Sequence, residues 1–498
     1  MVRPRPSASF RTHQRRLPAV LSQWVGDRAG DLPFLLIALI CMTFLLGGSA
    51  RSDALSTIPL RLLTGFAFGF ALWRITIADI VRHRGLAAIL LACVVLIGLH
   101  LVPLPYNLWS NLPGHAIVAQ TDKIAGLGQN WRALSLAPSQ SWNALFAFLT
   151  PLTLFLLGAS ASKKQLQGLL PVILILGLVS ACLGVLQLVG SQSNPFYLYR
   201  ITNGGFPVGL FANRNHNAMF LSMLIPLLVV FASQAAARNS FNDAKPWMAA
   251  IFALFLFPMI LVAGSRAGLL GGTVAAIACY FIYKAPETTQ SRRVRYKEHT
   301  DKEAQIIAAN KLRRNRIILF SLLAVIVVGI AIAVSRASAL TRLLNDGIQD
   351  QSRLTVWAAI WEMAKSYFPF GSGIGSFVEV YKLGEPTELL TTTYLNHAHN
   401  DWLEIWLTTG VAGVVIALAA LAWTVRRLVP VWFTKRWNID LAYARAASII
   451  VILFAIYSIG DYPVRAPSMA CLLILMMLWL DKEFVEDKSA QDFNNPVP

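Results

Sequence analysis

Apolar residues recur along the chain in runs of nearly twenty residues, separated by polar connections. A hydrocarbon core about 30 Å thick is crossed by about 20 residues of α-helix, so each run predicts one span. The runs cover residues 33–50, 57–80, 86–103, 143–160, 168–189, 216–236, 247–264, 267–284, 316–334, 410–429, 444–461 and 467–481. The pattern therefore predicts an all-α polytopic membrane protein with about 12 transmembrane helices.

Basic residues fall on one side of this predicted topology, after every second run. They are Arg3, Arg5, Arg11, Arg15, Arg16, Arg82, Arg84, Lys163, Lys164, the segment 285–315, Arg426, Arg427, Lys435 and Arg436. Because cytoplasmic loops carry an excess of Lys and Arg, we expect this side and both termini to be cytoplasmic. The basic N-terminus is followed by no short apolar segment with a small-residue cleavage site, so no removable signal peptide is expected.

The chain then divides into five predicted parts. They are a disordered basic tail at 1–30, spans one to nine at 31–334, a large partly helical loop at 335–409, spans ten to twelve at 410–484, and a C-terminal tail at 485–498. Within the first bundle, the loop 104–142 faces outward and the basic loop 285–315 faces the cytoplasm. Loops as long as 335–409 are usually functional or disordered, and we expect this one to cap the outer face.

Composition supports the membrane class. Hydrophobic residues make up 56% of the chain and charged residues 14%, against roughly 25% charged residues in soluble domains. The net charge of +18 follows from the positive-inside bias and does not call for nucleic-acid binding. The five cysteines all lie in apolar runs without metal-binding spacing, so they are expected to be small buried hydrophobes.

Three polar clusters fall on the predicted outer side. The first is the segment 213–217 in "GLFANRNHNAMF", and the second is Ser265 with Arg266 in "AGSRAGLLGG". The third is "YLNHAHNDWLEIWLTTG", which holds His397 and His399. A chain so rich in Leu, Ile, Val and Ala gathers amides, imidazoles and guanidinium groups at few places, so these clusters are the candidate sites.

Each arginine has two interpretations. Arg266 at a span end either extends its side chain to lipid phosphates or binds a ligand phosphate, whose oxygens match the planar guanidinium two at a time. Arg214 either faces water beside an Asn215 or Asn217 helix cap, or lines a sugar site with those amides. Arg353 in "DQSRLTVW" is either a structural surface residue or a third anion contact.

The two histidines have three interpretations. An HxH pair is weak evidence for a metal, because a zinc site needs further ligands at recognisable spacing. Asn400 or Asp401 can cap a helix beginning at "WLEIWLTTG". Imidazole is also a general base near neutral pH, and His399 precedes a span on the outer side, where a lipid-anchored substrate would present its headgroup. The stretch "GSGIGSF" lacks a P-loop's GK[ST] ending and is expected to be a turn.

Together these residues resemble the O-antigen ligase superfamily, which includes O-antigen ligases, polysaccharide polymerases and protein O-oligosaccharyltransferases. The outer-loop motif of that family, H[NSQ]-x9-G-x-x-[GTY], matches His399-Asn400, Gly410 and Gly413. The segments "FANRNH", "GSRAG", "WRALSLAP" and "FPFGSGIGSF" also look like those of its members. The resemblance covers most of residues 100–415.

The resemblance implies a metal-independent, inverting glycosyl transfer from undecaprenyl diphosphate. By analogy, Arg214 and Arg266 hold the diphosphate and His399 takes the proton of the acceptor hydroxyl. The residues then assigned to substrate binding are Asn213, Asn215, His216, Ser265, Arg353 and Asn400, while Gly410 and Gly413 are structural. No metal, cofactor, nucleotide or nucleic acid is expected.

The acceptor stays open at this stage. A ligase uses lipid A–core, a polymerase uses another lipid-linked unit, and an O-oligosaccharyltransferase uses a protein hydroxyl; the sequence favours the ligase, with the polymerase close behind. A transporter or flippase of lipid-linked sugars would place charge at mid-membrane depth and break helices on both sides. Here the candidate residues lie on one side, so we expect an enzyme of the bacterial inner membrane with a periplasmic site, acting on lipopolysaccharide or polysaccharide biosynthesis.

Overall fold

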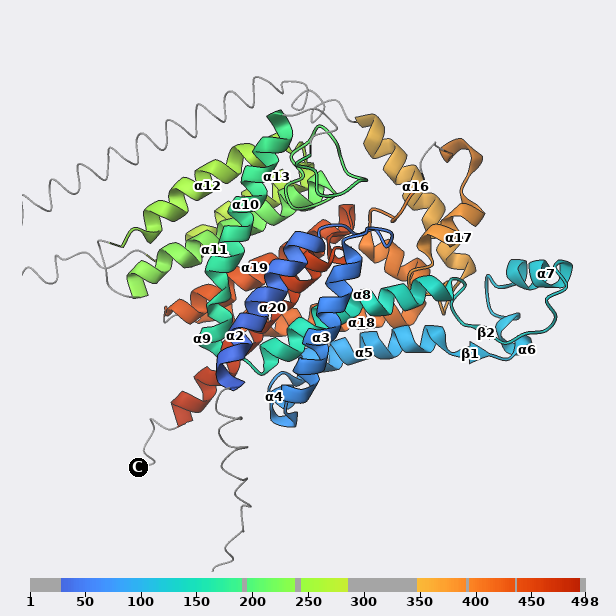
Figure 1. Ribbon diagram of the computed structural model, residues 1–498, viewed down its shortest axis with the longest axis horizontal. Helices are drawn as coiled ribbons and strands as arrows, with labels where there is room; N and C mark the ends of the chain where they lie inside the picture. Colours follow the sequence, from blue (N-terminus) through green and yellow to red (C-terminus); the bar gives the residue numbers. More distant parts are fainter. Residues whose placement is uncertain are drawn as a thin grey trace, which may run out of the picture.

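A computed structural model describes residues 28–189, 195–237, 243–284, 347–390, 394–434 and 437–492. These parts are mostly helical, and two short strands pair antiparallel. The elements are α2 Arg28–Leu46, α3 Thr57–Arg74, α4 Ile77–Arg82, α5 Arg84–Leu101, β1 Pro103–Leu104, α6 Tyr106–Trp109, α7 Ala116–Ile124, β2 Arg132–Ala133, α8 Pro138–Ala159, α9 Lys163–Gln167, α10 Leu169–Val189, α11 Arg214–Ala237, α12 Lys245–Val262, α13 Arg266–Ile282, α16 Gly347–Ser366, α17 Phe377–Gly384, η2 Thr387–Leu389, α18 Asp401–Phe433, α19 Ile439–Gly460, η3 Pro463–Arg465 and α20 Pro467–Asp492 (Figure 1).

The helices follow the apolar pattern of the sequence. Every predicted run overlaps a helix except 316–334, which lies outside the described residues, and the run 57–80 is divided between α3 and α4 by the Thr76 cap. Seven described helices are long and apolar enough to cross a membrane, and Leu32–Leu46, Arg266–Ile282 and Pro467–Asp481 are shorter apolar helices. The all-helical class is thus confirmed, while the count of about 12 spans and the placement of the loops stay predictions.

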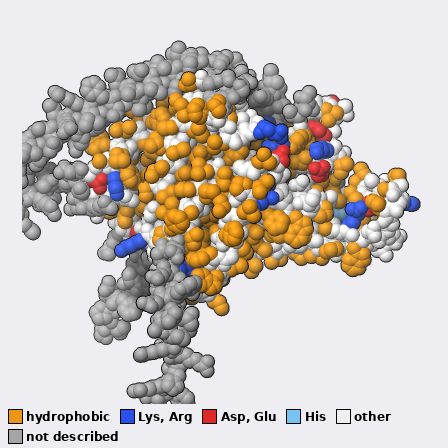
Figure 2. All heavy atoms as spheres, in the orientation of Figure 1, with side chains coloured by type: hydrophobic (Ala, Val, Ile, Leu, Met, Phe, Trp, Pro, Cys, Tyr) orange, Lys and Arg blue, Asp and Glu red, His pale blue; other side chains and the backbone are white. Residues whose placement is uncertain are grey.

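The core of the bundle forms around α11, which packs against α10, α12, α13 and α19. Its side chains are buried along most of its length, among them Phe220, Leu224 and Leu227. The face of the bundle that Figure 2 shows is largely apolar, and many large hydrophobic side chains of the helices are exposed. A helix that is apolar all round needs a nonpolar environment on its outer side, which fits a membrane protein.

The predicted basic connections meet at one end of the bundle. Lys163, before α9, pairs with Asp440 at the start of α19 at 2.5 Å. Arg427 near the end of α18 pairs with Asp481 of α20 at 2.6 Å, and His83 between α4 and α5 lies 2.7 Å from the same carboxylate. These contacts bring together loops that the sequence placed on one side.

The opposite end carries a cap built from two distant segments. In the first, strand β1 follows α5 and pairs with β2, and α6 and α7 lie near them; the second segment forms α16 and α17 (Figure 1). The "GSGIGSF" stretch forms the predicted turn at its centre. Its Ile374 N–H donates to His100 Nδ1 at 3.1 Å, and its Ser372 carbonyl accepts from Leu136 N–H at 2.9 Å. The "WRALSLAP" and "FPFGSGIGSF" segments therefore pack together.

The "GSGIGSF" turn is hydrogen-bonded to α18 at a kink around Gly410. The Gly410 backbone has φ 58° and ψ −149°, a conformation that essentially only glycine adopts. The kink frees two carbonyls of the preceding turn: Ser372 N–H donates to Leu407 O at 3.0 Å, and Gly373 N–H to Thr408 O at 2.8 Å. The backbone conformation at Gly410 and the hydrogen bonds to the turn thus explain why the motif has a glycine at this position.

Gly410→Ala is expected to destabilise the protein strongly. A Cβ atom on Gly410 would lie 2.0 Å from the Pro369 carbonyl oxygen, and the backbone conformation alone would cost about 1–3 kcal/mol. Thermal unfolding in detergent measures the effect. The matched control is Gly98→Ala on α5, where a Cβ meets nothing within 4 Å. Equal melting temperatures for both variants would contradict this account of the kink.

Candidate active site

The link between α19 and α20 meets the predicted histidine segment. Asp461, the first residue after α19, is buried, and its Oδ1 lies 3.4 Å from Nδ1 of His399. Its Oδ2 accepts a hydrogen bond of 2.8 Å from the Asn215 amide of α11. The Asp461 carboxylate therefore links His399 of the third polar cluster to Asn215 of the first. Asp461 itself lies in a segment that the sequence did not single out.

His399 has a strained backbone. Its φ of 50° is the only positive value among the non-glycine residues that the structure describes, and such outliers persist where surrounding contacts over-determine them. The preceding residue is held on both sides: Ala398 N–H donates to Glu404 Oε2 at 2.9 Å, and Ala398 O accepts from the Trp357 indole at 2.9 Å. The following residue, Asn400, caps α18 by accepting from Leu403 N–H at 3.0 Å.

A network of charged groups stabilises the start of α18. The Arg465 guanidinium, on η3, donates from Nε to Asp401 Oδ1 at 2.9 Å and lies 3.4 Å from Glu404 Oε1. Glu404 also lies 3.0 Å from Nδ1 of His397. Buried carboxylates are stable only when paired and hydrogen-bonded, so Arg465 fixes the helix start and, through Glu404, the peptide before His399.

Tyr462 is the hub of the aromatic groups at the site. Its ring centroid lies 4.9 Å from that of His399, 4.5 Å from His397 and 5.1 Å from His216. The His399 and His216 rings meet it edge to face, a favourable arrangement of aromatic quadrupoles. Tyr462 thus contacts all three imidazole rings of the site.

The electrostatics of the link favour a permanent negative charge beside His399. Burial alone would raise the pKa of Asp461, but the neighbouring His399 and His216 and the Asn215 amide together hold that pKa well below its usual value. Burial would lower the pKa of Arg465, yet Glu404 and Asp401 raise it overall. Asp461 therefore stays ionised, and Arg465 stays protonated, across the physiological pH range.

The two predicted arginines begin α11 and α13, whose starts lie side by side at the same end of the bundle. Arg214 begins α11, immediately before the residue that bonds Asp461, and its guanidinium carbon lies 4.1 Å from the Phe206 ring centroid. Its Nη1 is next to Gly264: a Cβ built on that glycine would be 3.5 Å away. Arg266 follows two residues later at the start of α13 and is exposed.

The residues assigned to substrate binding make contacts within the protein. Asn213, rather than Asn215 or Asn217, caps α11 through Asn215 N–H at 2.8 Å. Ser265 is buried and caps α13 through Gly268 N–H at 3.1 Å. His216 is 1% exposed, with Nε2 at 3.8 Å from Asp461 Oδ1. In these places Asn213 and Ser265 hold the helix starts that carry the two arginines, and His216 packs beside Asp461. Their contact with substrate stays a prediction.

Arg353 lies on a different element, half-buried near the start of α16. It precedes Trp357 by four residues, so both side chains lie on one face of the helix, and Trp357 bonds the peptide before His399. The assignment of Arg353 as an anion contact stays a prediction.

Sequence reasoning missed Asp461, Tyr462 and Arg465. They form the short link "GDYPVRAP" between two apolar runs on the predicted outer side. An acidic and a basic residue in so short a link between spans was the available signal, because ionisable groups near spans usually mark function or pairing. Asp461 lies outside the histidine motif, so the motif does not indicate the carboxylate that faces both His399 and His216.

Comparisons with known proteins agree with part of this picture. Residues 250–418 match a family model described as O-antigen ligase, a range that includes Ser265, Arg266, His399 and Gly410. None of the curated proteins compared with the chain matches it. Within the described parts of the chain, no group of three His, Cys, Asp or Glu residues is arranged to hold a metal ion.

Proposed function

We propose that the chain, whose residues 250–418 match a family model described as O-antigen ligase, is a membrane glycosyltransferase that moves a glycan from undecaprenyl diphosphate to an acceptor hydroxyl. The observation that supports this most directly is the pairing of a strained, partly exposed His399 with the buried Asp461, whose other oxygen bonds Asn215, the neighbour of Arg214 at the start of α11. We further propose that the protein resides in the bacterial inner membrane with this site on the periplasmic side.

His399 acts as the general base in this proposal. Its Nδ1 is buried and faces Asp461, while a quarter of the side chain is exposed, so Nε2 is the nitrogen available to the acceptor. It takes the proton of the acceptor hydroxyl as that oxygen bonds to the anomeric carbon. Asp461 orients the ring and stabilises the imidazolium that forms.

Arg214 and Arg266 act on the leaving group. The bond between the anomeric carbon and the phosphate oxygen breaks with its electron pair passing to undecaprenyl diphosphate, and the two guanidinium groups stabilise the charge that grows there. The donor is already activated, so the step needs no nucleotide and no metal ion. A single in-line attack inverts the configuration of the anomeric carbon.

The acceptor distinguishes three forms of this function. Purified protein in detergent should transfer glycan from a synthetic polyprenyl-diphosphate donor when given the right acceptor: lipid A–core for a ligase, a second lipid-linked unit for a polymerase, or a Ser/Thr peptide for an O-oligosaccharyltransferase. We propose the ligase, with the polymerase as the alternative. Absence of transfer to all three acceptors, with a folded protein, would refute a glycosyltransferase.

Asp461→Asn is expected to lower kcat about tenfold to hundredfold. This loss is smaller than the full contribution of a general base, because His399 itself stays in place. The amide keeps the size of the side chain but cannot stabilise an imidazolium, so the acid limb of the pH–rate profile should move to lower pH. In the wild type that limb does not report Asp461, because the pKa of Asp461 is lowered and its carboxylate is ionised throughout. An unchanged profile would show that Asp461 does not act through His399.

A further inference from the structure

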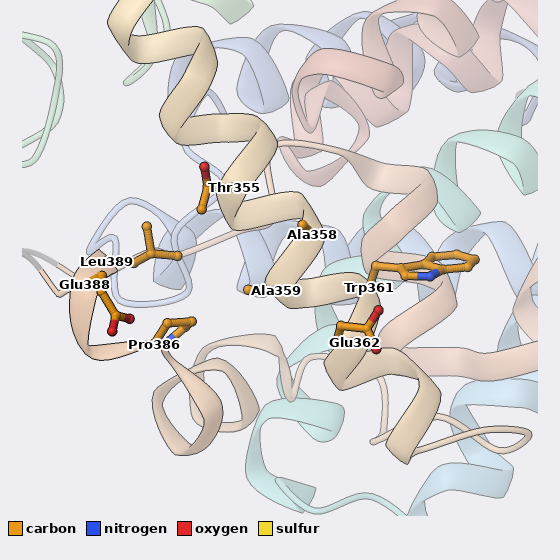
Figure 3. Close-up of a pocket in the computed structure, with 8 residues that line it drawn as sticks. All are labelled: Thr355, Ala358, Ala359, Trp361, Glu362, Pro386, Glu388 and Leu389. Carbon is orange, nitrogen blue, oxygen red and sulfur yellow. The ribbon is translucent and has the colours of Figure 1, made fainter.

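The cap contains a cavity outside the catalytic cluster. It has a volume of about 530 Å³ and lies between α16 and the segment that includes η2. It is lined by Thr355, Ala358, Ala359, Trp361, Glu362, Pro386, Glu388 and Leu389 (Figure 3). Its volume is in the range of small-molecule sites, which are mostly apolar with a few placed polar groups.

The lining chemistry excludes a phosphate and suits a sugar. None of the eight lining residues is Lys or Arg, and two are glutamates, so an anionic diphosphate would be repelled. Ala358, Ala359 and Leu389 offer an apolar floor for the C–H face of a sugar ring, and Glu362 and Glu388 offer acceptors for its hydroxyl groups. Glu362 also pairs with Lys365 at 2.7 Å at the exposed surface, and such a pair contributes little, so its carboxylate oxygens stay accessible to a ligand.

Helix α16 lies between the cavity and the peptide that precedes His399. Thr355, Ala358 and Glu362 share the outward face of α16 by their spacing, whereas Trp357 on another face bonds the peptide before His399. Trp361 lies at the end of the cavity away from Leu389 (Figure 3), is 47% exposed, and stacks on Trp406 of α18 with ring centroids 6.0 Å apart. An aromatic surface thus leads from the cavity toward the start of α18.

We propose that this cavity is a subsite for an uncharged, hydroxyl-rich sugar of a glycan, several units from the reacting bond. The inference rests on the proposed function, since a glycan held at His399 and the two arginines must extend away from the membrane across the cap. The sugar can come from the donor glycan or from the acceptor glycan. Either source is recognised by the same carboxylates and apolar floor.

The test uses the full chain in detergent with Ala358→Trp, which fills the cavity from an exposed position on α16. Leu383→Trp on α17, also exposed and not among the lining residues, is the matched control. KM is measured for donors carrying one sugar and for donors carrying a long glycan, and likewise for short and long acceptors. Glu388→Gln, which adds no bulk, is measured in parallel.

We expect Ala358→Trp to raise KM about tenfold, the equivalent of about 1.4 kcal/mol, for the long substrate only. Sensitivity to donor length assigns the subsite to the donor glycan, and sensitivity to acceptor length assigns it to the acceptor. An unchanged KM for long substrates, or an equal loss with one-sugar and long substrates, would overturn the subsite. Absence of transfer by the wild type with every substrate would instead refute the proposed function.

Discussion

His399→Asn is expected to lower the rate of glycan transfer about 10²- to 10⁴-fold, the usual contribution of a general base. Asparagine is chosen because it tolerates the left-handed conformation that His399 adopts at φ 50°. The variant should therefore keep its fold while losing the base. Its amide has no nitrogen lone pair that can take the proton of the acceptor hydroxyl.

His399→Ala serves as the comparison, because alanine has neither a base nor tolerance for that backbone. It should be as inactive as His399→Asn and also less stable, by about 1–2 kcal/mol. Single-turnover transfer and thermal unfolding are measured on the same preparations. A folded His399→Asn variant with wild-type turnover would show that another group removes the proton, and the proposed mechanism would be wrong.

The helices could be predicted from the sequence because burial in an apolar environment leaves a pattern of fixed length. The run 143–160 became α8 and the run 444–461 became α19, with starts several residues earlier in each case. Helix ends were less predictable. The tenth apolar run was expected to begin at Gly410, yet α18 begins at Asp401, at the Asn400 cap that was one interpretation of the histidine segment, and the helix continues through a glycine kink.

The candidate site was only half visible in the sequence. A motif with fixed spacing identified His399 and Gly410, and each arginine was conspicuous in an apolar chain. The partner of His399 was not, because Asp461 follows it by 62 positions and a sequence does not show which links between helices meet at one end of a bundle. The same reason hid Arg465, whose role depends on reaching Asp401 and Glu404.

The structure also changes how the amides of the first cluster are understood. Asn213 and Asn215 were assigned to substrate because polar groups at a membrane surface suit sugars. Their contacts are the helix cap and Asp461, and backbone donors at a helix start need such partners. Their short polar side chains therefore position Arg214 and the Asp461 carboxylate. This structural role accounts for the asparagines as well as sugar binding does.

Arg266→Ala is expected to lower kcat about 10²- to 10³-fold, the loss that follows removal of one group stabilising transition-state charge. Arg266 begins α13 and is exposed at the end of the bundle where Arg214 lies, so it can reach a lipid-linked diphosphate. Arg266→Lys keeps the charge but replaces the planar fork with a point charge. It should recover only part of the activity.

The matched control is Arg132→Lys in the cap, where the arginine pairs with Asp122 and has no place in the proposed chemistry; its turnover should equal that of the wild type. The lysine series separates the two interpretations of Arg266. A side chain that only extends to lipid phosphates works equally well as Arg or Lys, because snorkelling requires length and charge alone. Full activity of Arg266→Lys would therefore assign Arg266 to the membrane surface. If a guanidinium group still binds the diphosphate, it must then be that of Arg214, and Arg214→Lys must lose activity.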